Sequence, residues 1–353
     1  MQLPKTDVAD KILAETKAII IRSATSQIVG YNNILTALKA LYAEGIPVVV
    51  LKGTYLKSLY PEPEFRIMGD SDILISDEAD LKKAFEIMKQ LGYSKCQIAW
   101  DEVEFSREGT VKFEVHKQLD LARNRNLKTE VCFTDYSKCL YEEIDNVNLL
   151  ILPHTDNLVY LFTHMVSHFV GGGFGFRQVF DIALFVGKRG EFVEWKRFWE
   201  NSKVLQLDKF ACNIFMILKK YFGVDISSIQ LPEDFNDYSE ELLERIYKNG
   251  VFGRGSKDSL YSNLMASGYV KGNIKSKNAF VNIINTLFPA KLFEEKYQYT
   301  QKHRFLLPIA WTGRIFTFMR NRFKFSDMKY YFTNANAARA KIDLIDKLGL
   351  KGF

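Results

Sequence analysis

The apolar pattern of this chain changes its period along the sequence, and this limits the folds that it can adopt. Residues 6–44 repeat apolar side chains at helical spacing, and so does the chain from about 153 onward. Between them, short apolar runs read as strands: IPVVVLKG, DSDILI, KCQIAW, EVEFSREG and TVKFEVHKQL. A glycine-containing turn between the last two predicts an antiparallel hairpin, so we expect a mixed sheet. We expect residues 6–44 to form two helices with a break near Gly30.

These patterns predict an α+β protein with a mixed-sheet core and a mostly helical C-terminal domain. The chain has 353 residues, of which 47% are hydrophobic, so it is long enough for two domains with a substantial core. We expect the core, with its N-terminal helices, to span residues 1–150 and the helical domain to span residues 151–353.

Charge and cysteine content restrict the class of protein less strongly. The net charge of +6 permits an anionic partner without requiring one. The four cysteines show no zinc-like spacing, and no apolar secretion segment precedes them. No apolar run approaches the ~18 to 20 residues needed to cross a bilayer. We therefore expect a cytoplasmic protein without a transmembrane segment.

Acidic residues interrupt the strand run DSDILI. In a strand, Asp70 and Asp72 lie on one face, with Cα atoms roughly 6.5 to 7 Å apart, while Ser71 and Ile73 lie on the other. A lone Asp-x-Asp is most often a turn or a solvated pair. Glu114 has the right strand parity to join the pair if its strand lies alongside. Three converging carboxylates repel one another unless cations such as two Mg²⁺ ions lie between them.

Residues upstream of this pair suit a phosphate. Gly53 and Thr54 follow a strand and begin a helix, so their backbone N–H groups are available to an anion. Lys52 and Arg66 add two cations nearby. Taken singly, the glycine is an ordinary turn residue and the cations are ordinary surface groups. The combination with the carboxylates favours a nucleotide site.

These residues resemble those of the nucleotidyltransferase fold of the DNA polymerase β superfamily. More closely, LKGTYLKSLYPEPEFRIMGDSDILI, FEVHKQL, LPHTDNLVYLFTHMVSHF and RQVFDIALF resemble an uncharacterised bacterial nucleotidyltransferase family. The resemblance spans roughly residues 46–199, and a weaker resemblance is found near the C-terminus.

The resemblance implies roles for the matching residues. Asp70 and Asp72 would be the metal-binding aspartates, and Glu114 the third metal-binding and catalytic carboxylate. Gly53 and Thr54 would stand for the Gly-Ser element that holds the triphosphate, although threonine departs from it and Gly53 lies further from Asp70 than in most members. The implied cofactor is Mg²⁺ or Mn²⁺ with a nucleoside triphosphate (NTP), such as ATP, as substrate.

Several polar residues beyond the core are candidates for a cleft. His164 and His168 stand at i and i+4 on one helix face, as do Arg177 and Asp181, and His116 lies on the strand of Glu114. The histidine pair lacks a third zinc ligand, which disfavours zinc. Hydrogen bonding within the domain, with an Arg177–Asp181 salt bridge, is the alternative to a role in the cleft.

The C-terminal segment is the most basic part of the chain. It interleaves aromatic residues with Lys302, Arg304, Arg314, Arg320, Arg322, Lys324 and Lys329. This pattern fits either a surface for RNA or an acidic membrane, or an amphipathic helix with aromatic residues in the core and solvated cations.

The sequence therefore predicts a metal-dependent nucleotidyltransferase that moves a nucleoside monophosphate to a hydroxyl acceptor and releases pyrophosphate. The acceptor is a small molecule, a protein side chain or a tRNA end, the last as in toxin-like relatives. The alternative is a non-catalytic nucleotide- or RNA-binding protein of the same fold.

Overall fold

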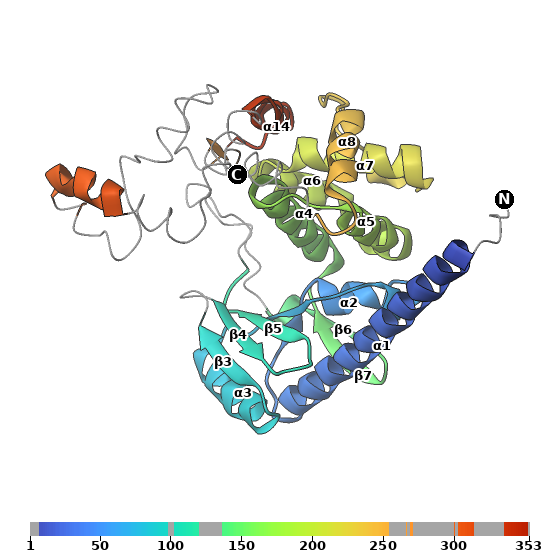
Figure 1. Ribbon diagram of the computed structural model, residues 1–353, viewed down its shortest axis with the longest axis vertical. Coiled ribbons are helices and arrows are strands. Elements are labelled where there is room, and N and C mark those ends of the chain that lie inside the picture. Colours follow the sequence, from blue (N-terminus) through green and yellow to red (C-terminus); the bar gives the residue numbers. More distant parts are fainter. Residues whose placement is uncertain are drawn as a thin grey trace. The chain divides into compact units, whose positions relative to one another are not determined.

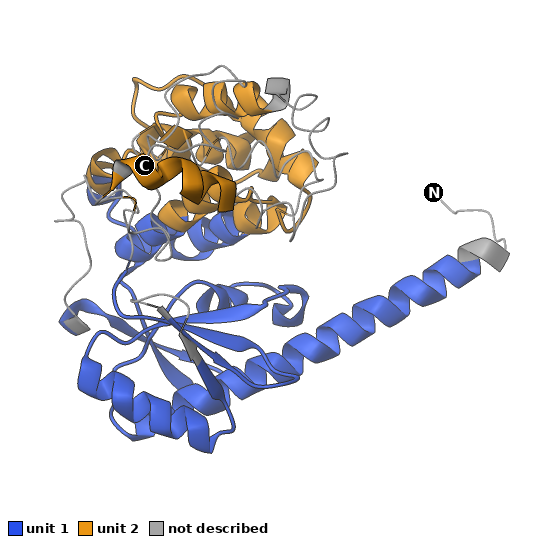
Figure 2. Ribbon diagram, turned by 60° about the vertical axis from the view of Figure 1, so that its left-hand side comes forward, with its two compact units in different colours: residues 1–121, 130–161, 181–198 blue, residues 122–129, 162–180, 199–353 orange. Residues whose placement is uncertain are grey.

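The computed structural model describes residues 7–97, 102–119, 136–253, 266, 269–270, 300, 303–313 and 335–351. Two compact units divide the chain (Figure 2). Unit 1 contains the described residues within 1–121, 130–161 and 181–198, and unit 2 contains those within 162–180 and 199–353. The expected boundary near residue 150 remains a prediction.

Unit 1 is built on a mixed sheet, which confirms the α+β prediction (Figure 1). Among the described residues the sheet has seven strands in the order β3-β4-β5-β2-β1-β7-β6. The strands are β1 Val49–Val50, β2 Asp70–Leu74, β3 Ser94–Gln97, β4 Glu102–Ser106, β5 Lys112–His116, β6 Leu140–Ile144 and β7 Val147–Ile151. The pairs β2–β5 and β1–β7 are parallel, and the other neighbours are antiparallel. The β4–β5 hairpin is as expected, with Gly109 at a positive φ of 74° in its turn.

The helices follow the expected pattern, with a predominantly helical region after β7. The described α-helices are α1 Asp7–Ala43, α2 Gly53–Lys57, α3 Glu78–Gln90, α4 His154–Gly171, α5 Phe176–Arg189, α6 Trp195–Val204, α7 Asp208–Phe222, α8 Ser239–Asn249 and α14 Ala335–Lys347. Short 3-10 helices occupy Pro63–Phe65, Tyr136–Lys138, Gly190–Phe192, Ser227–Ile229 and Arg304–Leu306. No helix in these described ranges is both long and apolar enough to span a membrane.

The expected break near Gly30 is wrong, because α1 continues through it as one helix of 37 residues. A Cβ atom at Gly30 would lie 2.6 Å from Cγ2 of Val111, the residue before β5. The glycine therefore allows close packing between α1 and the sheet, and it does not end the helix. Further along, α1 contacts α3, and the two helices lie side by side in Figure 1.

The two faces of the β2–β5 pair have different chemistry. One face is apolar and carries Ile73, Phe113 and Val115, each at most 1% exposed. Helix α3 covers this face at the neighbouring strand β4, where the rings of Phe85 and Phe105 lie 5.3 Å apart. The α3 helix is held at its start by Asp77, whose side chain accepts hydrogen bonds from two backbone N–H groups. The other face of the pair carries the polar side chains of the candidate site.

Unit 2 has an aromatic core between its helices. The ring of Phe162 in α4 lies 5.3 Å from that of Phe215 in α7, and the ring of Phe169 lies 5.8 Å from that of Phe210. Helix α7 also packs against α8. It ends at Gly223, whose φ of 64° permits the left-handed cap. Residues 314–334, which hold most of the basic C-terminal segment, lie outside the described residues.

Candidate metal and nucleotide site

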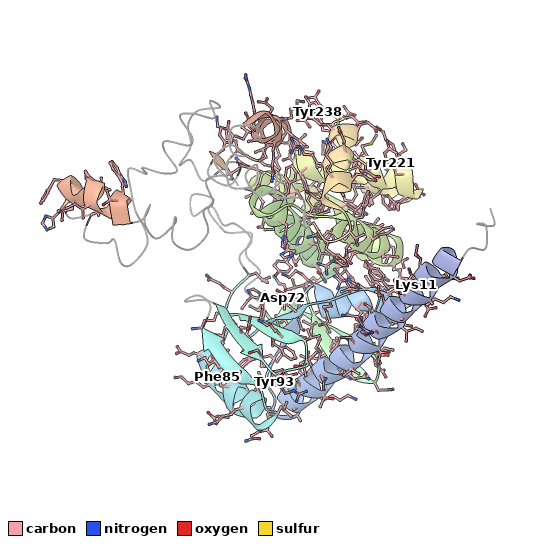
Figure 3. All side chains as sticks on the ribbon, viewed as in Figure 1. Lys11, Asp72, Phe85, Tyr93, Tyr221 and Tyr238 are labelled. Carbon is pink, nitrogen blue, oxygen red and sulfur yellow. The ribbon has the colours of Figure 1, made fainter. Side chains whose placement is uncertain are left out.

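The register of the parallel pair β2–β5 places the candidate carboxylates side by side. Asp72 is the partner of Glu114, and Leu74 is the partner of His116. Directly opposite residues of neighbouring strands project from the same face of a sheet. The expected pairing of these strands is therefore confirmed. Asp72 lies on the side of unit 1 away from Phe85 and Tyr93, which contact the apolar face (Figure 3).

Three side chains form a compact donor cluster on the polar face, which we call the Asp72 cluster: Asp72, Glu114 and His116. One ligand atom from each lies within 4.8 Å of the others. The Nε2 atom of His116 lies 3.1 Å from Oδ1 of Asp72. Asp72 is 3% exposed, whereas Glu114 and His116 are half-buried, so the cluster is partly open to solvent at Glu114 and His116. Two carboxylates and an imidazole are ligands that suit a divalent metal ion.

Asp70 lies on the same face at the exposed start of β2. It is two residues from Asp72 and is the register partner of Lys112. The group of three close donor atoms does not include it. Its role as a second metal ligand therefore remains a prediction.

Lys52 lies directly against the cluster. The backbone N–H of Leu51 donates to the carbonyl of Asp72 at 2.9 Å, which places the next residue beside the Asp72 side chain. The Lys52 Nζ atom is 2.8 Å from Oδ1 of Asp72 and 5.8 Å from the ring centroid of Tyr160. Burial is the largest single influence on the pKa of Lys52 and lowers it, but Asp72, Tyr160 and Asp70 together outweigh burial and hold this pKa above its ordinary value. Lys52 is thus a fixed cation at the site.

The backbone at Lys52 is unusual for a residue with a side chain. Its φ of 37° and ψ of −108° lie outside the regions that most residues adopt. Such conformations cost of order 1–3 kcal/mol and persist only where the surroundings hold them. Here the strand hydrogen bond on one side and the start of α2 on the other provide that constraint.

Gly53 and Thr54 begin α2 with their side-chain positions turned inward. A Cβ atom at Gly53 would lie 2.7 Å from Sδ of Met68, so only glycine fits without a shift. Thr54 is fully buried, and its Oγ1 lies 2.7 Å from Oγ of Ser71. The Thr54 hydroxyl therefore helps to hold the core. A contact of these residues with phosphate has to use their backbone groups.

Arg66 makes a buried ion pair with Asp181, in the part of α5 that belongs to unit 1. Its Nε and Nη2 atoms donate to the two Asp181 oxygens at 2.8 and 2.9 Å, and Tyr60 donates to Oδ1 at 2.8 Å. Its Nη1 atom also donates to the carbonyl of Gly53 at 3.1 Å. Burial is the largest single influence on the pKa of Arg66 and lowers it, but Asp181 and Tyr60 together raise this pKa above its ordinary value. Arg66 therefore holds the start of α2 in place through its hydrogen bond to the Gly53 carbonyl.

The remaining candidates are found in unit 2. The Nε2 atoms of His164 and His168 lie 2.9 Å apart. Among the described residues, this pair belongs to no group of three donors close enough to hold a metal ion. Arg177 donates its backbone N–H to the carbonyl of Val251 at 3.1 Å, and its guanidinium carbon lies 5.9 Å from the ring centroid of Phe252. These contacts fasten the start of α5 to the segment after α8.

Sequence reasoning missed two features of this site. Tyr160 lies beside Lys52, and the only signal was its place in an apolar helical run. The partner of Arg66 is 115 residues away, and the helical i, i+4 rule instead suggested Arg177 for Asp181. By contrast, strand parity correctly placed Glu114 and His116 on the face of Asp72.

The mixed sheet with its helices and the Asp72 cluster are consistent with a nucleotidyltransferase core. A family model described as uncharacterised nucleotidyltransferase matches residues 2–223. The chain belongs to this family, and the matched range includes both the Asp72 cluster and the Arg66–Asp181 pair. No curated protein and no solved structure matches the chain.

Proposed function

We propose that this protein transfers a nucleoside monophosphate from an NTP, such as ATP, to a hydroxyl acceptor and releases pyrophosphate. The observation that carries the proposal is the register Asp72–Glu114, which sets two carboxylates next to each other on the polar face of a buried strand pair. Membership of a nucleotidyltransferase family supports the reaction type.

In this proposal, Asp72 and Glu114 supply oxygen ligands for Mg²⁺ or Mn²⁺, and Asp70 supplies a further one at the exposed end of β2. When bound, the ion would lower the pKa of the acceptor hydroxyl and neutralise negative charge on the triphosphate. Both aspartates lie on one strand, so their separation is set by the strand itself.

Lys52 supplies positive charge at the same place. Its ammonium lies 2.8 Å from Asp72, within reach of any phosphate oxygen that approaches the cluster. The backbone N–H groups at the start of α2 give further donors for the triphosphate, and Arg66 holds that start in position through the Gly53 carbonyl. In this proposal Arg66 is a positioning residue rather than a phosphate ligand.

The reaction balances without any redox partner. The acceptor oxygen forms a bond to the α-phosphorus as the bond from that phosphorus to the bridging oxygen breaks. Pyrophosphate leaves with the bonding electron pair, and the hydroxyl proton passes to a carboxylate or to solvent. Positioning and charge neutralisation account for most of the rate enhancement in such transfers.

The test uses each α-labelled NTP with Mg²⁺ or Mn²⁺ and a cell extract as the source of acceptor. We expect transfer of label and release of pyrophosphate, and a loss of at least about 100-fold in Asp72→Asn. Glu86→Gln is the matched control, because this carboxylate is exposed on α3, which covers the opposite face of the sheet. Equal transfer by Asp72→Asn and the unmodified protein contradicts the proposal. So does nucleotide binding without any transfer, which indicates a non-catalytic binding protein.

A further inference from the structure

We propose that His116 is a direct metal ligand, so that the site prefers Mn²⁺ to Mg²⁺. The inference rests on the proposed function, because it concerns the ion that the Asp72 cluster would hold. It adds a nitrogen donor to a site for which the carboxylates alone predict only oxygen ligands.

The geometry of β5 places His116 at the cluster. Glu114 and His116 are two residues apart on one strand, so they project from the same face, and Asp72 lies across from Glu114. The Nε2 atom of His116 lies 3.1 Å from Oδ1 of Asp72. Neighbouring ligands on an octahedral ion with bonds of about 2.1 Å lie about 3 Å apart. The observed separation therefore suits two adjacent ligands of one ion as well as a direct hydrogen bond, and the experiment below distinguishes the two.

The burial of the three residues agrees with this arrangement. Asp72 is deeply buried, while Glu114 and His116 are half-buried, so solvent reaches the cluster at these two residues. An ion between them would have protein ligands on the deep side and open positions on the other. Open positions are what a triphosphate needs in order to bind the same ion.

The chemistry of the donor groups determines whether the site prefers Mn²⁺ or Mg²⁺. Mg²⁺ favours oxygen ligands and retains several of its waters. Imidazole suits the transition metals, and carboxylate suits both Mg²⁺ and Mn²⁺. Two carboxylates with one imidazole therefore favour Mn²⁺ over Mg²⁺, whereas a site of carboxylates alone gives no such gain.

A different role for His116 makes a different prediction. If the imidazole only donates a hydrogen bond to Asp72, it orients that carboxylate and contributes no bond to the ion. Replacing it would then weaken the binding of Mn²⁺ and Mg²⁺ by similar factors. A change in the ratio of the two affinities is specific to ligation through nitrogen.

Electron paramagnetic resonance (EPR) of the purified full-length protein with Mn²⁺ tests the inference. We expect ¹⁴N coupling to the bound Mn²⁺ in electron spin echo spectra of the unmodified protein, together with an affinity for Mn²⁺ at least about tenfold above that for Mg²⁺. His116→Gln should lose the ¹⁴N coupling and most of the Mn²⁺ preference. His303→Gln is the matched control, because this histidine is exposed and lies in unit 2.

The outcomes separate this inference from the proposed function. If Mn²⁺ binds in a manner that depends on Asp72 but without ¹⁴N coupling, the assignment of His116 is overturned and the nucleotidyltransferase proposal stands. If Asp72→Asn and the unmodified protein bind Mn²⁺ equally, the metal site itself is wrong. The spectrum of the unmodified protein is informative even if His116→Gln does not fold.

Discussion

Unit 1 contains two buried charge clusters that differ in how completely their charges are matched. In the Arg66–Asp181 cluster, one guanidinium meets one carboxylate through two hydrogen bonds, with Tyr60 donating a third. In the Asp72 cluster, two carboxylates and an imidazole lie beside the ammonium of Lys52. Arg66 and Asp181 together carry no net formal charge, whereas Asp72, Glu114 and Lys52 together carry a formal charge of −1.

The difference distinguishes buried charges that stabilise the fold from buried charges that can bind a metal ion. A matched and bidentate pair is already satisfied and gains little from a ligand. A cluster with excess negative charge and an open side gains from a cation. We therefore expect changes in the Arg66–Asp181 cluster to affect mainly folding, and changes in the Asp72 cluster to affect mainly metal binding and transfer.

The largest expected effect is on transfer activity in Glu114→Gln. Loss of one carboxylate from the cluster should lower the rate by about 1,000-fold, because the charge on the triphosphate is then less well neutralised. Glu104→Gln is a close control, since Glu104 is the partner of Glu114 on β4 and pairs with Lys112 at 2.9 Å. Steady-state rates with labelled NTP make the comparison. Similar losses in the two variants would contradict a specific role of Glu114 in transfer.

The next effect is on stability in Asp181→Asn. This change leaves the guanidinium of Arg66, which is 4% exposed, without its counter-charge. We expect a loss of about 3 kcal/mol in the free energy of unfolding, measured by urea denaturation. Asp70→Asn, at an exposed position, should change it by less than about 0.5 kcal/mol. A loss below about 1 kcal/mol in Asp181→Asn contradicts a structural role for the pair.

A smaller effect is expected on metal affinity in Lys52→Met. The ammonium and a metal ion compete for the charge of Asp72, so its removal should tighten Mn²⁺ binding by about tenfold while impairing transfer. Lys112→Met is the control, because this lysine lies on the same face but pairs with Glu104. Titrations followed by EPR give both affinities. Weaker Mn²⁺ binding in Lys52→Met is the contrary result.

The smallest effect concerns Lys57, which adds a second buried cation next to Arg66. Its Nζ donates to the Arg66 carbonyl at 3.0 Å, and burial, followed by repulsion from Arg66, lowers the pKa of Lys57 to about 8. Between this pKa and the unfolded value near 10.5, the unfolded chain holds more protons, so stability rises with pH.

We therefore expect a gain of at most about 1 kcal/mol in the free energy of unfolding between pH 7.5 and 9, and no such gain in Lys57→Met. Lys82→Met, on the exposed surface of α3, should retain the gain. An unchanged pH profile in Lys57→Met shows that this lysine keeps an ordinary pKa in the folded protein.

Local patterns were enough to predict the elements of the site. The period-two alternation of β2 and β5 predicted which side chains share the polar face, and the pairing of the strands bears this out. The glycine between β1 and α2 was recognised as the start of a helix. Each of these inferences depends on residues close together in the chain, where backbone geometry alone determines the arrangement.

Contacts between distant segments were not predictable in the same way. Arg66 offered no local signal that its partner would be Asp181 rather than a phosphate. Gly30 resembled a helix break because propensity disfavours glycine in helices, yet packing against Val111 explains its presence. Thr54 matched a phosphate-binding element, but its hydroxyl is bonded to Ser71 in the interior. In each case tertiary packing determined the role of the residue.

The most direct test of the account is a crystal structure with Mn²⁺ and a non-hydrolysable NTP analogue, using the anomalous scattering of manganese to locate the ion. We expect a manganese peak about 2.2 Å from carboxylate oxygens of both Asp72 and Glu114, with phosphate oxygens on the side of the ion that faces solvent. A nucleotide-bound ion that contacts neither carboxylate, with Asp72 still paired to Lys52, would contradict it.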